Sequence, residues 1–597
     1  MKRIGFYLRD YKKESVLGPL FKLLEAFFDL MVPLVMAAII DTGIAGDDLP
    51  YVIKLSIVLV ALAIIGLTCS VTAQYFSAKA AVGLASHLRH DLFGHIQSLG
   101  YTELDTIGTS TLITRMTSDI NQVQNGVNMC LRLLLRSPFI VFGAMILAFT
   151  IDVKAALVFA VTIPILAVIV YGIMFITMPM YKQVQTMLDK VLGRTRENLT
   201  GVRVIRAFNK EAYETEGFAS ESLALNKSQR LAGRISGLTN PLTYVVINLA
   251  TVFLLYTSGV RINAGGLTQG QLIAMVNYMT QILVELVKLA NLIVTLTKAM
   301  ACFGRIETVL KTENSMEYPN RDAASDNQKR QPCVEFDHVS LTYAGAGDKS
   351  VNDITFAAEK GSVIGVIGGT GSGKTSLISL IPRFYDATMG SVKIDGVDVK
   401  DYSKETLRDK IGIVPQKSLL FAGTIRDNLL WGNENATEEE LWEALRISQG
   451  EEFVRSKPEG LNEKIEQGGR NLSGGQRQRL AIARAMVKKP EILIMDDSAS
   501  ALDFATDAAL RHAIQEMENA PTMFIVSQRA SSIQFANQIL VLEDGKCVGM
   551  GTHDELLETS ETYKEIYDSQ FKKPEELYKA SSPEPRHQGD VLGGAKA

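Results

Sequence analysis

Residues 363–375 read VIGVIGGTGSGKT and decide the fold of the second half of the chain. The run Val363–Ile367 is apolar and β-branched, which predicts a buried strand, and SLISLIPRF after the threonine predicts a helix. Between them GGTGSGKT matches a P-loop in full, in the strand–loop–helix context that this motif requires. A glycine-rich surface turn is the alternative, and the GKT ending with both flanks argues against it. We therefore expect an α/β nucleotide-binding domain here.

The residues of the loop predict how a nucleotide would be held. Glycines let backbone N–H groups approach phosphate oxygens, and the start of a helix adds a favourable dipole. Lys374 is expected to reach the terminal phosphates of ATP, and the Thr375 hydroxyl is expected to bind Mg²⁺. The candidate ATP-binding residues of the loop are Gly368, Gly369, Thr370, Gly371, Ser372, Gly373, Lys374, Thr375 and Ser376.

A second apolar run ends in a carboxylate. Residues 492–496 read ILIMD, which has the form of a Walker B strand whose last residue, Asp496, is a candidate Mg²⁺ ligand. A core strand that merely ends in a surface aspartate would look the same. The P-loop upstream favours the Walker B interpretation.

Length and composition exclude several classes of protein. A chain of 597 residues is too long for a single core, so we expect at least two domains. A net charge of −4 argues against a nucleic-acid partner, and 21% charged residues are too few for a disordered chain. The five cysteines are scattered without metal-ligand spacing, so neither a disulfide framework nor a zinc site is expected.

The first 310 residues contain six apolar stretches of membrane-spanning length. The connections after the second and fourth stretches are long, rich in Lys and Arg, and helical in their periodicity. The positive-inside rule therefore places them, and both termini, in the cytoplasm, with the spanning helices running on past the bilayer. The basic N-terminus has no cleavage site after it, so no cleaved signal peptide is expected. The stretches begin near Val16, Val52, Leu133, Ala155, Pro241 and Gln271.

Ionisable residues interrupt two of these stretches. Glu285 and Lys288 lie inside the sixth, in QILVELVKLAN, where charges usually face a cavity or a partner. The alternative is an intrahelical pair near the cytoplasmic end, and the sequence leaves both open. Lys22, Glu25 and Asp29 in the first stretch are expected to mark its water-accessible cytoplasmic end.

These observations give a domain organisation. We expect a six-span transmembrane domain at 1–310, a polar linker at 311–332, a nucleotide-binding domain at 333–572 and a poorly ordered tail at 573–597. The alternating run VEFDHVSLTY predicts the first strand of the soluble domain.

The run NLSGGQ at 471–476 resembles the signature motif of ATP-binding-cassette (ABC) proteins. With six spans ahead of the cassette, the chain resembles an exporter half-transporter over residues 1–572. The resemblance implies the type I exporter fold, with Tyr343 stacking on adenine and Gln416 as a Q-loop ligand of Mg²⁺. The segment Glu466–Gly469 resembles the exporter-specific stretch before the signature. The other positions that the resemblance assigns to the ATP site are Ser473, Gly474, Gly475 and Gln476 of the signature and Asp503 of the D-loop Ser500–Asp503.

The family resemblance also implies a mechanism. Two cassettes would close head to tail, so that each ATP lies between the Walker motifs of one chain and the signature of the other. Coupling segments near Thr106–Leu112 and Asn209–Glu214 would transmit this closure to the membrane helices in an alternating-access cycle.

Two positions depart from the family pattern. Asp497 follows Asp496 where a competent cassette has the glutamate that activates water, and Gln528 replaces the switch histidine. An aspartate carboxylate sits roughly 1.5 Å further back, and losing a general base lowers the rate by about 10²–10⁴-fold. We therefore expect a site that binds ATP but hydrolyses it slowly, with the ATPase activity belonging to an assembled dimer. This resembles one subunit of heterodimeric bacterial exporters of the multidrug type; a homodimer with two slow sites is the alternative.

Two other functions are alternatives to that of an exporter subunit. An ATP-gated channel or regulator on the same scaffold would also suit slow hydrolysis, whereas a soluble cassette ATPase conflicts with six spans. We expect a multi-pass protein of the cell membrane, with its cassette in the cytoplasm and the lipid bilayer as a partner. Amphipathic drugs or lipids are the expected substrates, although the same apolar residues suit lipid-facing helices.

Overall fold

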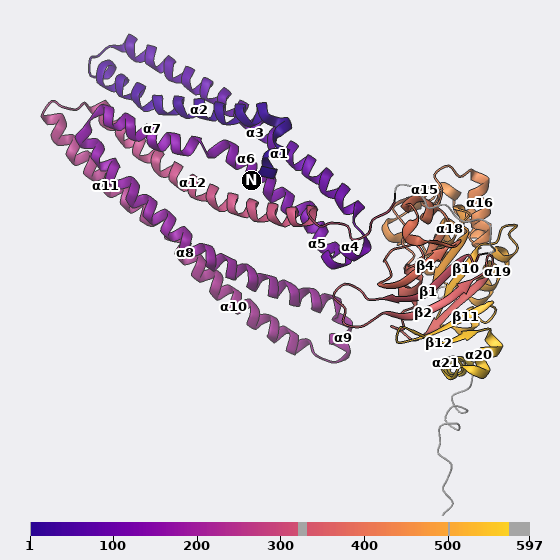
Figure 1. Ribbon diagram of the computed structural model, residues 1–597. Helices are drawn as coiled ribbons and strands as arrows, with labels where there is room; N and C mark the ends of the chain where they lie inside the picture. The colour runs from indigo at the N-terminus through magenta and orange to yellow at the C-terminus, as the bar shows by residue number, and fades with distance from the viewer. Residues whose placement is uncertain (1, 320–330, 499–501, 572–597) are drawn as a thin grey trace, which may run out of the picture. The chain divides into compact units, whose positions relative to one another are not determined.

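The computed structural model describes residues 2–319, 331–498 and 502–571, and the chain forms two compact units. The membrane unit combines Met1–Ser98 with Gly108–Thr312, and the cassette unit combines Leu99–Ile107 with Glu313–Ala597. Figure 1 shows long helices in the first and strands flanked by shorter helices in the second. Half of the expected linker (320–330), the D-loop residues Ser500 and Ala501, and the expected tail lie outside the described residues.

Six helical segments of the described membrane unit are long and apolar enough to span a bilayer, which confirms the expectation from the sequence. The longest helices reach well beyond a bilayer. The 50 residues of Leu49–Ser98 extend about 75 Å at 1.5 Å per residue, against a hydrocarbon core of about 30 Å. The segments are Arg9–Ile44, Leu49–Ser98, Thr109–Ile151, Val153–Thr200, Glu211–Asn263 and Gln269–Leu310.

The membrane unit contains the following helices. They are α1 (Lys2–Tyr7), α2 (Lys12–Ala38), α3 (Leu49–Ser98), α5 (Thr109–Thr114), α6 (Ile120–Leu133), α7 (Arg136–Ile151), α8 (Val153–Thr200), α9 (Val202–Ala207), α10 (Glu211–Gly237), α11 (Thr239–Asn263) and α12 (Gln269–Leu310), with short turns η1 (Arg9–Tyr11), η2 (Ile39–Ile44) and η3 (Arg115–Asp119).

The core of this unit lies where α2, α7, α8, α11 and α12 meet, and alanines are prominent in it. Ala26, Ala144, Ala156 and Ala274 are fully buried. Small side chains allow helix backbones to approach closely, which is how helices pack where no water drives them together. At the short link before α8, Asp152 caps the helix by accepting from Ala155 N at 2.8 Å and pairs with Arg261.

The cassette unit is built on two larger sheets and a small strand pair within its described part. A six-stranded sheet has the order β12-β11-β3-β10-β9-β6, parallel except for β12, and a four-stranded antiparallel sheet has the order β2-β1-β4-β5. Strands β3, β9 and β10 are buried at every residue, as expected for apolar runs covered on both faces.

The elements of the cassette unit have these bounds. The strands are β1 (Val334–Leu341), β2 (Val351–Ala358), β3 (Val363–Gly368), β4 (Met389–Ile394), β5 (Val397–Asp398), β6 (Ile411–Val414), β7 (Gly423–Thr424), β8 (Lys464–Ile465), β9 (Ile492–Asp496), β10 (Thr522–Val526), β11 (Gln538–Glu543) and β12 (Lys546–Gly551). The main helices are α4 (Tyr101–Ile107), α13 (Lys374–Ser379), α14 (Lys404–Asp409), α15 (Ile425–Leu430), α16 (Glu438–Ile447), α17 (Glu451–Arg455), α18 (Gly474–Val487), α19 (Phe504–Gln515), α20 (His553–Thr559) and α21 (Glu561–Phe571).

One boundary expected from the sequence differs in the structure. The helix after the P-loop was expected through Phe384, but α13 ends at Ser379, because Pro382 disfavours helical geometry in the residue before it. The segment Leu99–Ile107, which includes α4, belongs to the cassette unit and overlaps the coupling segment expected near Thr106–Leu112 at its first two residues.

Candidate nucleotide-binding site

The P-loop joins the end of β3 to the start of α13, as its pattern predicts. Gly373 has a φ of 94°, and a Cβ there would lie 2.3 Å from the Ser350 carbonyl oxygen, so only glycine fits. A Cβ at Gly369 or Gly371 would meet nothing within 4 Å. The exposed side of the loop is therefore open, which suits a cradle for phosphate groups. Thr370 lies on this exposed side, whereas Ser372 is buried.

Lys374 lies across this cradle. Its Nζ donates to the carbonyl oxygens of Gly368 at 2.9 Å and Gly369 at 2.6 Å, and its side chain is largely buried. Burial lowers the pKa of the Lys374 ammonium, and the nearby carboxylates of Asp497 and Asp496 oppose that effect. A phosphate anion in the cradle would add a favourable partner for this partly desolvated charge.

Thr375 and Asp496 meet at the foot of the loop. The Thr375 hydroxyl donates to the two carboxylate oxygens of Asp496 at 3.1 and 3.2 Å. Burial raises the pKa of Asp496, and this hydrogen bond opposes the shift. Mg²⁺ favours oxygen ligands and usually takes one or two carboxylates together with substrate phosphates. The hydroxyl and carboxylate therefore fit a magnesium site completed by a nucleotide.

Gln416 does not complete this group in the structure. It follows β6, the neighbour of β9, and its residue is exposed. Among the described residues, no hydrogen bond joins its side chain to Thr375 or Asp496. Its role as a ligand remains an expectation.

Tyr343 lies beside the start of α13. Its hydroxyl donates to Ser376 Oγ at 2.9 Å, and its ring meets that of Tyr385 edge to face with centroids 5.0 Å apart. Tyr385 in turn donates to the Asp105 carboxylate of α4 at 2.6 Å. The sequence did not reveal this connection between the tyrosine expected at adenine and α4, because these residues are far apart along the chain.

Asp497 and Gln528 follow β9 and β10, two adjacent parallel strands. Asp497 has a φ of 46°, in the left-handed region that non-glycine residues seldom adopt, and its N–H donates to the Val526 carbonyl at 3.0 Å. Gln528 is exposed, and its backbone carbonyl accepts from Gln570 Nε2 at 2.8 Å. The strand ends thus bring both departures from the family pattern to the same edge of the sheet as the P-loop.

The signature residues form the N-terminus of α18. Ser473 Oγ accepts from Gln476 N at 3.3 Å, while Gln476 Oε1 accepts from Ser473 N at 3.0 Å, which completes a capping box. Gly474 and Gly475 form the first turn, and Ser473 and Gly474 are exposed. The sequence signal for this cap is the spacing of three residues between Ser473 and Gln476.

Asp503 caps α19 by accepting from Thr506 N at 2.9 Å, and this hydrogen bond lowers the pKa of its carboxyl group. The preceding D-loop residues Ser500 and Ala501 lie outside the described residues.

The ionisable residues of the first apolar stretch differ from expectation. Lys22 and Glu25 were expected at a water-accessible end, but they pair with each other at 2.5 Å and their side chains are only 8% and 13% exposed. Asp29 is 43% exposed.

On α12, Glu285 and Lys288 form the intrahelical pair at 2.9 Å, and Glu285 also contacts Arg136 of α7. The two alternatives left open for Glu285 and Lys288 therefore coexist.

Comparison with known proteins agrees with this architecture. Residues 15–286 match the ABC transporter transmembrane region, and residues 351–500 match the ABC transporter domain. The chain belongs to the ABC transporter family and has the form of an exporter half-transporter, a multi-pass membrane domain followed by a cassette in one chain.

Its relatives match along nearly their whole length. An uncharacterized ABC transporter ATP-binding protein of Mycobacterium tuberculosis is 36% identical over 572 residues, which cover 94% of this chain and 97% of the relative. The uncharacterized ABC transporter ATP-binding protein YfiB of Bacillus subtilis is 35% identical, covering 96% of this chain and 99% of its own. A solved bacterial Atm1-family ABC exporter with ATP bound superposes with a TM-score of 0.75 at 22% identity, over 94% of this chain and 99% of that one. This likeness shows that the fold is that of type I exporters.

Proposed function

We propose that this chain is one subunit of an ATP-driven exporter of the cytoplasmic membrane and that it acts with a second, different half-transporter. Membership of the ABC transporters and the exporter fold support the general activity. In this proposal the cassette faces the cytoplasm, and the substrates are amphipathic molecules of the multidrug or lipid type.

The observation that carries the heterodimer is the contrast between binding and catalytic positions. The groups that would hold the phosphates are in place, with Lys374 across an open cradle and Thr375 on Asp496. At the positions of the general base and the switch histidine, the chain has Asp497 and Gln528. This chain's own Walker site then binds ATP and hydrolyses it slowly, while its signature completes a competent site on the second subunit.

Magnesium would neutralise phosphate charge in the bound nucleotide, held by Thr375 and Asp496 with Gln416 as a further candidate ligand. The protein groups have separate tasks. Lys374 attracts the terminal phosphates, Tyr343 supports the base, and the glycines of the loop leave backbone N–H groups free to face phosphate oxygens. Asp497, with its short side chain, orients water poorly.

Coupling to the membrane domain is proposed to run through α4. Asp105 accepts from Tyr385, and the Tyr101 ring lies 4.5 Å from that of Phe384, so α4 is attached to the cassette close to Tyr343. The second proposed coupling segment, Asn209–Glu214, contains the turn between α9 and α10.

The test compares two substitutions on the assembled complex by steady-state ATP hydrolysis. Asp497→Asn is expected to change turnover little, because this carboxylate is not the working base. Gly474→Glu is expected to abolish most turnover, because it places a negative charge where the second subunit's ATP would lie. A Cβ at Gly474 meets nothing within 4 Å, and an acidic residue in the first turn suits a helix, so the substitution leaves α18 itself intact.

Gly474→Gln is the matched control of equal size without the charge, and its loss of turnover should be smaller. The chain purified alone should hydrolyse ATP slowly. Loss of turnover with Asp497→Asn but not with Gly474→Glu would make this chain's own site the catalytic one and overturn the proposal. Fast hydrolysis by the chain alone would favour a homodimer.

A further inference from the structure

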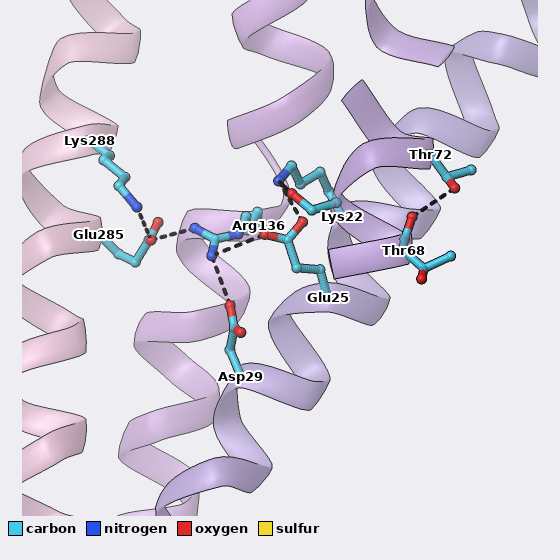
Figure 2. Close-up of polar contacts among 9 residues, drawn as sticks. Lys22, Glu25, Asp29, Thr68, Thr72, Arg136, Glu285 and Lys288 are labelled. Atoms are coloured by element: carbon cyan, nitrogen blue, oxygen red, sulfur yellow. Dashed lines mark hydrogen bonds and ion pairs between the residues drawn. The ribbon is translucent and has the colours of Figure 1, made fainter. Parts of the chain in front are cut away.

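Six ionisable side chains gather inside the membrane unit, on α2, α7 and α12 (Figure 2). Three are acidic and three are basic, so the group as a whole is neutral. The six are Lys22, Glu25, Asp29, Arg136, Glu285 and Lys288.

This cluster lies deep in the membrane unit. Glu285 is about 24 Å along α12 from its start at Gln269, and Arg136 is about 22 Å from the end of α7 at Ile151, at 1.5 Å per residue. Both helix ends adjoin short links. Counted from the membrane surface at those links, the charges lie about 22–24 Å into a hydrocarbon core of about 30 Å. Ionisable residues at such a depth usually face a cavity or a partner, because an unpaired charge there is strongly disfavoured.

Arg136 and Glu285 form the interior of the cluster. The guanidinium of Arg136 donates to Glu285 at 2.5 Å and to Asp29 at 3.0 Å, and Figure 2 shows it between these two carboxylates. Glu285 also accepts from the Ser137 hydroxyl at 2.7 Å and from Lys288 at 2.9 Å. The side chains of Arg136 and Glu285 are 11% and 4% exposed, so their charges are largely satisfied within the protein.

Asp29 and Lys288, at the two ends of this series of contacts, are more exposed than Arg136 and Glu285. The side chains of Asp29 and Lys288 are 43% and 42% exposed, and both line a cavity of about 360 Å³. Arg136 binds one oxygen of Asp29, and one contact to Glu285 leaves further donor capacity on the Lys288 ammonium. Gln281, another lining residue, has a buried Oε1 without a hydrogen-bond partner among the described residues.

The remaining wall of the cavity combines apolar and polar side chains. Val32, Ile140 and Val284 give it apolar contact area, and Asn277 and Thr280 add polar groups. Arg136 and Glu285 already pair with Asp29 and Lys288, but an uncharged ligand would cover the remaining Asp29 acceptor and Lys288 donors without giving them a partner, and a ligand with one charge would serve only one of the two. The chemistry that matches both is an ammonium group together with an anionic group, separated by an apolar portion.

We propose that this cavity binds a zwitterionic ligand, with its ammonium at Asp29, its carboxylate or phosphate at Lys288 and a hydrogen-bond donor at Gln281. The proposal rests on the export function proposed above and names the substrate class of that exporter. Two sources share this chemistry: a short apolar peptide with free termini and a phosphatidylethanolamine headgroup. Two or three extended residues span roughly 7–10 Å. The contacts that lead from Asp29 through Arg136 and Glu285 to Lys288 measure 3.0, 2.5 and 2.9 Å.

The experiment measures binding of four forms of the tripeptide Leu-Phe-Leu to the full chain in lipid-free detergent, by equilibrium dialysis with mass-spectrometric quantification. The forms are the free peptide, the N-acetyl peptide, the C-terminal amide and the doubly capped peptide. We expect either single cap to weaken binding about tenfold or more, since each removes one charge-assisted contact. Measurable and equal binding of all four forms, or tightest binding of the doubly capped form, would overturn the proposal.

Variants assign each end of the ligand. Asp29→Asn should remove the effect of acetylation but keep the effect of the amide, and Lys288→Gln should do the reverse. Lys79→Gln is the control, because Lys79 pairs with Glu14 outside the cavity, and it should keep both effects. Loss of both effects in either cavity variant would contradict the assigned orientation of the ligand.

The lipid arm repeats the titration with dioleoylphosphatidylethanolamine, with dioleoylglycerol as the uncharged comparison. Binding of the phospholipid but not of dioleoylglycerol or the peptide supports the proposal with a lipid as the source. Absence of binding by every zwitterionic probe overturns it. A fluorescent ATP analogue is titrated in parallel, because normal ATP binding in that case leaves the proposed export function standing, whereas loss of ATP binding would count against that function.

Discussion

Replacing Arg136 by methionine tests whether the buried charges of the membrane unit depend on one another. The substitution keeps an apolar stem and removes the guanidinium that joins Glu285 and Asp29. Breaking a buried ion pair by removing one partner costs about 3–5 kcal/mol. Glu285 keeps Ser137 and Lys288 as donors, so we expect the lower end of that range, about 3 kcal/mol. At an unfolding entropy of about 2.1 cal/mol/K per residue, such a loss lowers the midpoint of thermal unfolding of a unit of roughly 300 residues by about 5 °C.

The chain offers a separate probe for each unit. Cys69 and Cys302 are buried in the membrane unit, so a thiol-reactive dye reports its unfolding in a variant whose other three cysteines are replaced. Trp431 and Trp442 are the two tryptophans of the chain and both lie in the cassette unit, so their fluorescence reports that unit. Arg136→Met should lower the dye transition and leave the tryptophan transition unchanged.

Two controls decide the interpretation. Arg194→Met removes a partly exposed arginine that pairs with Glu214 and Glu221, and we expect it to cost less than about 1 kcal/mol. The double variant Arg136→Met/Glu285→Met should recover most of the stability, because it removes both members of the pair. A shift of less than about 2 °C for Arg136→Met, or additive losses in the double variant, would refute the reasoning.

Three further predictions concern the cassette. Lys374→Ala should greatly weaken binding of a fluorescent ATP analogue to this chain's own P-loop, since it removes the ammonium from the phosphate cradle; unchanged affinity would contradict the assignment. Gly373→Ala should destabilise the cassette by about 1–3 kcal/mol in urea titrations followed by tryptophan fluorescence, because the backbone has a φ of 94° and a Cβ would meet the Ser350 carbonyl at 2.3 Å; a native midpoint would show that the loop relaxes freely. Tyr385→Phe removes the donor to Asp105 and should raise amide hydrogen exchange in α4 by up to about tenfold without changing exchange in β3, whereas protection equal to wild type would mean that this hydrogen bond does not hold α4.

The sequence predicted the parts of this protein that depend on short segments. The P-loop, the strand ending at Asp496 and the signature are each written in a few consecutive residues, and the six spans follow from long apolar runs. The end of α13 at Ser379 was also within reach of the sequence, because Pro382 signals it.

What the sequence did not predict depends on residues from different elements. The sequence predicted that Lys22 and Glu25 lie at the water-accessible end of a helix. Their burial depends on the neighbouring helices, which the sequence pattern does not show. The attachment of α4 to the cassette depends on Tyr385, which is almost three hundred residues from Asp105. The left-handed backbone of Asp497 has no local signal such as glycine, so a sequence pattern cannot reveal it.

If Ser473 contacts the second subunit's ATP as proposed, its hydroxyl group has two tasks, because it also caps α18. Its oxygen already accepts from Gln476 N, and a serine hydroxyl has one proton and two lone pairs, so the proton is still available to an anion. The oxygen that caps α18 therefore keeps a proton to donate to the proposed ligand. In that proposal, removing the Ser473 hydroxyl would affect both the start of α18 and ATP binding, whereas a side chain added at Gly474, where a Cβ meets nothing within 4 Å, would affect ATP binding alone.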